Sequence, residues 1–309
     1  MAGNVPYGTL TGTSTISNLV QTAYDQYVRM ALRSIPVMRA LADVKPVQQA
    51  MPGSSVVFSI YSDLAQATST LTESSDVSSI ALGNPNQITV TLQEYGSAVT
   101  TTKKLNLTSF NDVDAALADI IAYNAADSID AVVAGVLTSG TNIIYGGTAT
   151  NTAGITAGST ISVSDIRAAV TNLRSNKALP RIGELYAAYL HPKQTADLRA
   201  ETGTGGFQDL SKYVDRTPFV AGAVGVLEGA FIVETPRVPY TSNGTTNVYS
   251  AIIAGREALA EAQGQDISTV IGPQIDALRR FHTIGWYYFG GWNLLRTAAL
   301  YNIQTATAY

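Results

Sequence analysis

Two short strand patterns far apart in the sequence constrain the fold most. Residues 56–61 and 88–92 are rich in branched and aromatic side chains, and the second pattern alternates apolar and polar residues as a half-buried strand does. About 25 residues rich in Ser, Thr, Asp and Asn separate the two patterns, which is too long for an ordinary hairpin turn. An isolated two-stranded ribbon is at best marginally stable in water. The sequence therefore predicts an extended ribbon that something outside it stabilises.

A single long helix follows the ribbon. Between Ser109 and Leu137, apolar residues recur every three or four positions, and Ser109 or Asn111 is a suitable N-cap. At 1.5 Å per residue this helix spans roughly 40 Å, which is long for a globular domain. Shorter helices are predicted over 164–177 and 191–200, and strands over 184–190, 231–234, 248–254, 268–272 and 278–289. This order does not alternate regularly between strand and helix, so it favours an α+β fold.

The beginning of the chain predicts an arm. Residues 1–14 are rich in Gly, Thr, Asn and Pro and have no core of their own. From Thr15 to Ile35, apolar residues recur with helical spacing and form one stripe. Pro36 ends this predicted helix or begins a short second one that runs to Leu41. The stripe packs either on the helix's own domain or on a neighbouring subunit, and the pattern leaves both open.

Composition limits what the surface can do. Charged residues make up 14% of the chain, against about 25% in an ordinary soluble domain, while hydrophobic residues make up 46%. A surface poor in charge is typical of one that becomes an interface. The net charge is −4, and the first 166 residues hold twelve acidic and six basic residues. No basic residue lies between Lys45 and Lys103, so the chain lacks the basic stripe that sequence-independent DNA binding usually needs.

Known catalytic motifs are absent from the sequence. Nucleophile-elbow, phosphate-loop and zinc-protease patterns do not occur, there is no cysteine, and there are two histidines. We therefore expect no catalytic residue, no cofactor and no metal site. Asp127 and Asp130 lie three positions apart on the predicted helix, and a solvated acidic face is the preferred interpretation of that pair. His191 is interpreted as the cap of the helix that follows it, and no segment is predicted to be a signal or to enter a membrane.

Three sequence runs carry a family resemblance. Residues 225–239 read GVLEGAFIVETPRVP, which is similar to a Gly-x-Leu-x-Gly-x-x-Val turn and strand followed by Val-Pro. Residues 11–20 (TGTSTISNLV) and 51–57 (MPGSSVV) are similar to one branch of phage coat proteins. With the order of arm, ribbon, long helix and mixed region, these runs make the chain resemble the major capsid (coat) proteins of tailed bacteriophages. That resemblance implies the Johnson fold of the Hong Kong phage type.

The resemblance also implies a division of the chain into five parts. These are an N-terminal arm at 1–45, an extended two-stranded E-loop ribbon at 46–102, a peripheral domain with the spine helix at 103–140, an axial domain at 141–266, and return strands of the peripheral domain with the C-terminal segment at 267–309.

The function implied by the resemblance is structural. The chain would self-assemble into pentamers and hexamers of an icosahedral phage head enclosing double-stranded DNA, without sequence-specific DNA binding and without a membrane. Separate scaffolding, portal and decoration proteins would be its other partners. It would be located in the virion capsid after assembly in the host cytoplasm. The alternatives are an encapsulin-like nanocompartment shell of the same fold, and a hydrolase that uses an Asp pair.

The candidate assembly interface combines the arm stripe, the facing sides of the ribbon strands and the polar ribbon tip. Its residues are Ile16, Leu19, Tyr24, Tyr27, Val56, Phe58, Ile60, Glu73, Asp76, Ile88, Val90 and Leu92. Exposed two-stranded ribbons invite pairing with other chains. We therefore expect the ribbon to lie over the adjacent subunit, with Glu73 and Asp76 near charged groups of that neighbour.

Overall fold

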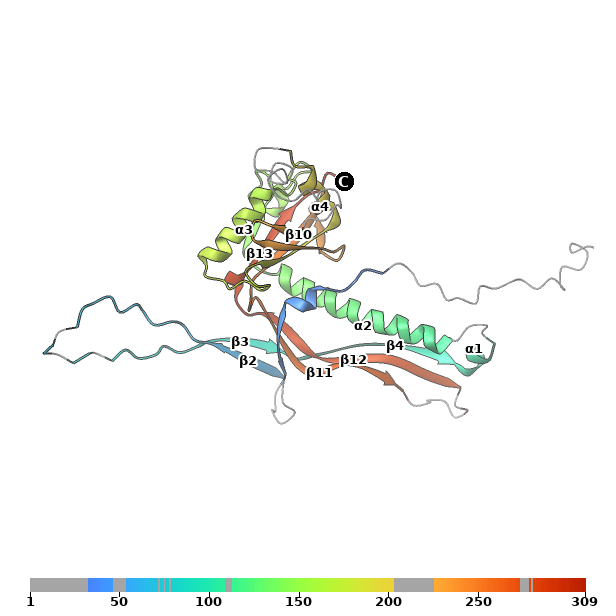
Figure 1. Ribbon diagram of the computed structural model, residues 1–309. Coiled ribbons are helices and arrows are strands. Elements are labelled where there is room, and N and C mark those ends of the chain that lie inside the picture. Colours follow the sequence, from blue (N-terminus) through green and yellow to red (C-terminus); the bar gives the residue numbers. More distant parts are fainter. Residues whose placement is uncertain are drawn as a thin grey trace, which may run out of the picture.

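The fold consists of two β-sheets, a two-stranded ribbon and a long helix (Figure 1). The computed structural model describes residues 33–46, 54–71, 73–74, 76–77, 79–108, 113–202, 225–272, 278 and 280–309. The ribbon projects from one end of the smaller sheet, and the larger sheet with its helices lies beyond the C-terminal end of the long helix. Helices and strands are mixed without a repeating unit, which confirms the predicted α+β class.

The smaller sheet has four strands in the order β1-β11-β12-β4. They are β1 (Ala42–Pro46), β11 (Leu259–Ile271), β12 (Phe281–Leu294) and β4 (Gln93–Thr102). Strand β1 is parallel to β11, and the other neighbours are antiparallel. The sequence assigned residues up to 102 to the ribbon, but β4 pairs with β12 along its whole length. Strand β4 is therefore part of the sheet, and the ribbon ends before it.

Helix α2 (Val113–Thr138) covers one face of this sheet and confirms the predicted long helix. Its stripe of Ile121, Ala125, Ile129, Val133 and Leu137 forms one core with Ile284, Trp286, Tyr288 and Trp292 of β12. The indole Nε1 of Trp286 also donates a hydrogen bond of 2.9 Å to Oδ1 of Asn124 on the helix. The stretch Leu117–Thr138 is long and apolar enough to cross a membrane, with mean hydropathy 1.4, but here its stripe packs on the sheet.

The larger sheet has seven strands in the order β5-β13-β10-β6-β8-β7, with β9 paired to β10. They are β5 (Ile143–Tyr145), β13 (Leu300–Thr305), β10 (Asn247–Ala254), β6 (Tyr186–Leu190), β8 (Ala230–Glu234), β7 (Val226–Leu227) and β9 (Tyr240–Ser242). Helix α3 (Val163–Ser175) packs on it through Ile166, Val170 and Leu173, and α4 (Pro192–Ala200) through Leu198. Ser162 begins α3 with a capping box to Asp165.

Two further predicted domain boundaries are wrong because sheet membership depends on partners distant in sequence. The segment 267–309 was assigned to return strands of the peripheral domain with a C-terminal segment, but β13 lies in the larger sheet between β5 and β10. The larger sheet's region was extended to residue 266, but β11 enters the smaller sheet at Leu259. The short helices η3 (Thr152–Gly154) and η4 (Thr297–Ala299) lie in the connections.

The arm joins the body earlier than the sequence indicated. Residues 33–37 have no helical structure, so the predicted helix does not reach Ile35, whose side chain is exposed. A short 3-10 helix, η2 (Met38–Leu41), follows Pro36 as predicted. Met38 and Leu41 are buried in the core beneath α2, and β1 continues directly into the sheet. Residues 38–45 therefore belong to the body rather than to the arm.

Candidate assembly surfaces

The structure describes the ribbon part of the predicted interface. Ile16, Leu19, Tyr24 and Tyr27 lie outside the described residues, so the arm helix stays a prediction. The described candidates are Val56, Phe58, Ile60, Glu73, Asp76, Ile88, Val90 and Leu92.

The ribbon strands β2 (Ser55–Ile60) and β3 (Asn86–Thr91) pair antiparallel, as the sequence predicts. Val56 lies opposite Val90, and Phe58 lies opposite Ile88. Residues directly opposite each other in an antiparallel pair share one face. Along β2 the even-numbered residues are half-buried and the odd-numbered residues are exposed, which confirms the predicted apolar face.

The base of the ribbon packs on its own subunit. Val90 is 0% exposed and Leu92 is 7% exposed, and both belong to one buried apolar cluster with Ala260 and Ala262 of β11. Val56 and Phe58 pack against the same cluster. The prediction that Val90 and Leu92 are kept for a neighbouring copy is therefore wrong, because their apolar area is buried within the chain.

A glycine makes this close packing possible. A Cβ atom at Gly291 of β12 would lie 2.0 Å from the carbonyl oxygen of Thr91 and 3.2 Å from Cγ1 of Val90. Atoms that are not bonded cannot approach so closely, so any side chain here must push the ribbon away from the sheet. The ribbon base is held against the sheet by backbone contact and cannot slide without losing that fit.

Gly291→Ala should loosen the ribbon base. We expect a loss of about 1–3 kcal/mol in the free energy of unfolding, typical of overpacking, and faster proteolysis within residues 54–92. Chemical denaturation and limited proteolysis measure both effects. Gly83→Ala is the matched control, because no atom lies within 4 Å of a Cβ there. Equal behaviour of the two variants would contradict this account of the contact.

The outer ribbon, defined as the described residues between 61 and 85, is exposed almost throughout. It carries large apolar side chains that solvent reaches freely: Tyr61, Leu64, Leu71, Val77, Ile80 and Leu82. Its charged residues are acidic, namely Asp63, Glu73 and Asp76, and Glu73 and Asp76 are exposed as predicted. So many large apolar side chains exposed on one projecting segment indicate an interaction site.

Exposed apolar side chains also occur at the opposite end of the subunit, near α1 (Lys103–Thr108) (Figure 1). They are Val99, Leu105, Leu107, Val270, Ile271, Leu278 and Phe281, and they lie on both faces of the sheet end. The ribbon points away from this end, so the two surfaces of one chain do not meet. A contact between the ribbon end of one copy and the α1 end of another would cover both.

The arm leaves the body along α2. The Arg33 guanidinium pairs with Asp119 at 2.8 Å and lies 4.8 Å from the ring centre of Tyr123. The Tyr123 hydroxyl donates to the carbonyl oxygen of Ser34 at 3.1 Å. Residues 39 to 33 thus follow the helix from Asp130 toward its N-terminus. The described end of the arm therefore runs along α2 toward the N-terminus of the helix.

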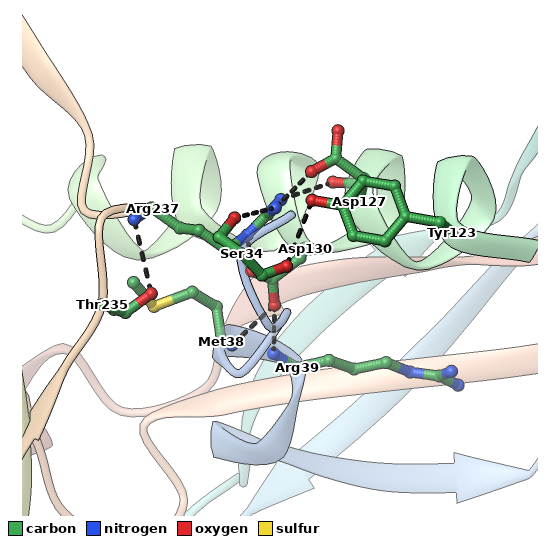
Figure 2. Close-up of polar contacts among 8 residues, drawn as sticks. All are labelled: Ser34, Met38, Arg39, Tyr123, Asp127, Asp130, Thr235 and Arg237. Carbon is green, nitrogen blue, oxygen red and sulfur yellow. Dashed lines mark hydrogen bonds and ion pairs between the residues drawn. The ribbon is translucent and has the colours of Figure 1, made fainter. Parts of the chain in front are cut away.

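A buried carboxylate joins the arm to the long helix (Figure 2). Asp130 of α2 is 1% exposed and accepts hydrogen bonds from the backbone N–H groups of Met38, at 2.6 Å, and Arg39, at 3.2 Å. These groups begin η2, whose own N-cap residue, Val37, forms no side-chain cap bond. Asp130 therefore caps η2 from another element.

Arg237 extends this network to the larger sheet. It follows β8, and its Nε donates to Asp130 Oδ2 at 2.5 Å. Its Nη1 donates to the Asp127 carboxylate and to Ser34 Oγ, and its Nη2 donates to the carbonyl oxygen of Asp127 at 2.8 Å. The solvated-face interpretation is wrong for Asp130, which is buried. The two carboxylates share a guanidinium rather than a proton, which makes them a structural clamp and not an acid–base pair.

A second buried carboxylate fixes η2 to the sheet. Glu261 of β11 is 0% exposed and accepts hydrogen bonds from Arg39, at 3.1 Å from Nε and 2.7 Å from Nη2. The Tyr288 hydroxyl donates to the same carboxylate at 2.9 Å. Burial, together with the neighbouring Glu261 charge, raises the pKa of Tyr288 above its ordinary value, so the hydroxyl stays a donor.

The remaining motif residues are structural where the structure describes them. His191 Nδ1 accepts a hydrogen bond from the Lys193 N–H, which confirms that it caps α4. Burial lowers the pKa of His191, which favours the neutral ring that this cap needs. Among the described residues, no group of three His, Cys, Asp or Glu side chains could hold a metal ion.

Comparisons with a protein-family model and with solved structures both point to phage capsid proteins. A protein-family model described as phage capsid protein matches residues 13–298 of the chain. A search of curated protein sequences found no match.

Solved structures share the fold at low sequence identity. The capsid of the cyanophage P-SCSP1u has a TM-score of 0.74 at 17% identity, over 94% of both chains. The mature capsid of bacteriophage PhiM1 has a TM-score of 0.71 at 11% identity, over 98% of this chain and 99% of that one. The head of Helicobacter pylori bacteriophage KHP40 has a TM-score of 0.71 at 12% identity, over 99% of both chains.

Proposed function

This chain belongs to the phage capsid protein family, and we propose that it forms the pentamers and hexamers of an icosahedral phage head enclosing double-stranded DNA. It is a major capsid protein, located in the virion capsid, and it is a structural protein rather than an enzyme. The observation that carries this conclusion is the family match over residues 13–298, together with a fold that extends over nearly the whole of each similar capsid chain.

The distribution of exposed apolar surface supports self-assembly. The outer ribbon and the α1 end of the smaller sheet lie at opposite ends of one subunit. A contact between two different surfaces of identical copies is heterologous, and it forms a closed ring when the rotation between copies is suitable. Pentamers and hexamers are rings of this kind. The low charge of the chain, 14% of residues, suits a surface that becomes an interface.

The charge distribution supports a weak, sequence-independent relation to DNA. The first 166 residues carry twice as many acidic as basic residues, and α2 presents Asp119 and Asp127 at its surface. An inner wall that bound phosphates tightly would hinder filling and release of DNA. Separate scaffolding and portal proteins, and decoration proteins on the outside, complete the proposal, with assembly in the host cytoplasm.

Electron microscopy of the expressed chain tests the proposal. We expect negative-stain images to show closed shells or capsomer-sized rings, with nucleic acid in any filled particle. Only monomers, even at high protein concentration and with co-expressed candidate scaffolding protein, would overturn it. The encapsulin-like alternative is not favoured by the family match, and shells filled with a cargo enzyme instead of nucleic acid would be its signature.

A further inference from the structure

The arm root, defined as residues 34–43, joins a core to which both sheets contribute. Met38 and Leu41 are 0% and 1% exposed, and they belong to one core with α2, with β12 and with Tyr189 and Ile252 of the larger sheet. The last residues of the arm root begin β1, which pairs with β11 of the smaller sheet. Because such a core is close-packed, the position of the larger sheet and the position of the arm root cannot change independently.

Arg181 attaches the larger sheet to one end of the arm root. It precedes β6, and its Nη2 donates to the carbonyl oxygens of Ala40, at 2.9 Å, and Ala42, at 3.2 Å. Its Nη1 donates to Asp43 Oδ1 at 3.1 Å. A guanidinium is a rigid planar fork, so these bonds together fix where the segment lies relative to the start of β6.

Arg237 attaches the same sheet to the other end of the arm root (Figure 2). Its Nη1 donates to Ser34 Oγ at 3.3 Å, and its Nε binds Asp130, which caps η2. Strands β6 and β8 are parallel neighbours; Arg181 precedes the start of β6, and Arg237 follows the end of β8. The two arginines therefore lie beyond opposite ends of a strand pair that is about 16 Å long. A sheet held at two such points cannot turn about one of them without breaking the other.

The arm root is also bound to the chain that connects the two sheets. This chain passes between them at 255–258 and at 295–299. Asp43 Oδ2 accepts the Glu257 N–H at 2.8 Å, and Glu257 Oε2 pairs with Arg296 Nε at 2.7 Å. Glu257 has a φ of 59°, in the left-handed region that residues other than glycine rarely adopt. Such strain persists only where the surroundings hold it, and the Asp43 carboxylate supplies one of the bonds that do so.

We propose that these contacts form a latch, meaning the bonds of Arg181 and Arg237 to the arm root, which couples the path of the arm to the angle between the two sheets. A neighbouring copy that draws the arm away from α2 opens the latch and frees the larger sheet to turn. By linkage, a turn of the larger sheet frees the arm with the same coupling free energy. Pentamers and hexamers join their subunits at different angles, and the latch lets one sequence adopt both. This use rests on the proposed function, whereas the coupling is a property of the single subunit.

Spin-label distances in the free subunit test the coupling, because the chain has no native cysteine. Ala118→Cys on α2 and Thr171→Cys on α3 lie at exposed positions and report the angle between the two parts of the fold. We expect one narrow distance distribution when only the two labels are present. Arg181→Met removes the bonds to the arm root and keeps an apolar stem. It should widen the distribution by about twofold or more, because the freed sheet samples more angles.

Further variants separate a shared contact from general loosening. Asp43→Ala should also widen the distribution, and the double variant with Arg181→Met should widen it by less than the sum of the two, because both remove one contact. Arg167→Met is the matched control, because Arg167 pairs with Glu228 at 2.9 Å within the larger-sheet part and does not bind the arm root. Equally narrow distributions in Arg181→Met and Arg167→Met would overturn the proposal.

Hydrogen exchange on the unmodified protein gives an answer even if Arg181→Met fails to fold. The Met38 amide, bonded to Asp130, and the Glu257 amide, bonded to Asp43, should open in one event. Their exchange rates should rise with urea by the same factor, and at lower urea than the rate of Ile252 in the central strand β10. Different urea dependence of the two amides, or exchange of both only together with Ile252, would overturn the proposal.

The same labels in shells connect the latch to assembly. With labelled subunits diluted into unlabelled ones, we expect shells to show a distance distribution that is shifted or split relative to that of free subunits. Shells with the unchanged distribution of the free subunit would overturn the proposed use of the latch. A wild-type chain that never forms shells would instead overturn the proposed function, and the result on the free subunit would stand.

Discussion

Asp130→Asn should lower the free energy of unfolding of the isolated subunit by about 3–5 kcal/mol, the range expected when one partner of a buried ion pair is removed. Asp130 is 1% exposed. One oxygen of its carboxylate accepts hydrogen bonds from the Met38 and Arg39 N–H groups, and the other accepts a hydrogen bond from Arg237. The asparagine oxygen can replace only one of these acceptors. Its NH₂ group would then face the Arg237 guanidinium, donor against donor, and the guanidinium would lose the buried one of its two counter-ions, keeping only the partly exposed Asp127.

Asp127→Asn is the matched control on the same helix. The Asp127 carboxylate also binds Arg237, but it is partly exposed, and the Asp127 carbonyl oxygen holds Nη2 at 2.8 Å whatever the side chain is. The amide oxygen of asparagine can still accept the bond from Nη1. We expect a loss of about 0–1 kcal/mol, as for exposed pairs. Urea denaturation of both subunits measures the difference, and a similar loss in the two variants would refute the special role of Asp130.

This network shows which parts of the fold the sequence could not predict. Helical spacing identified the long helix, and strict alternation identified the ribbon face. Both patterns are local, because each is formed by residues a few positions apart in the sequence. The partner of Asp130 lies 107 positions away, in the run after β8, and no local pattern marks Arg237 as its partner. A helix pattern with a buried acid has the same spacing as one with a solvated acid. The solvated-face prediction failed for that reason.

The interface prediction failed for Val90 and Leu92 for a related reason. Alternation correctly placed both on the apolar face of the ribbon, but it does not say what covers that face. The covering surface is built from Ala260, Ala262 and the space above Gly291, which come from a distant part of the chain. Small residues such as those in β11 and β12 indicate that another backbone approaches closely, but the sequence does not identify which segment that backbone belongs to. The outer ribbon is the part of the ribbon that remains for a neighbour.

The same limit explains the misassigned strands. Neither β4 nor β13 was predicted from the sequence as a separate strand: β4 was placed within the ribbon and β13 within the C-terminal segment. Their sheets are determined by pairing with β12 and β10, respectively. The chain crosses between the two sheets at residues 255–258 and again at 295–299. A hydrophobic strand has the same sequence pattern whichever of the two sheets it joins.

Deletion of residues 1–32 should leave a folded subunit that forms no stable shells. Among the described residues, the contacts between the arm and the body start at Arg33 and Ser34 and end in the buried carboxylate clamp, and the core beneath α2 is built from residues that follow Pro36. We therefore expect the subunit to fold without residues 1–32. The predicted helix over 15–32 would be about 27 Å long. From Asp119, where Arg33 is anchored, α2 continues for only six residues, or about 9 Å, to Val113. An arm helix that continues in this direction outruns its own α2, so its apolar stripe needs a neighbouring copy.

Paired substitutions separate the stripe from the mere presence of the arm. Tyr24→Glu with Tyr27→Glu puts two charges on the predicted stripe and should behave like the deletion, because a charge in an interface core must be desolvated without a partner. Asn18→Glu with Thr22→Glu adds the same charge to the opposite side of the predicted helix and should assemble. Circular dichroism verifies folding of each subunit, and electron microscopy counts shells. Normal shells from the deletion would show that the arm does not tie subunits together.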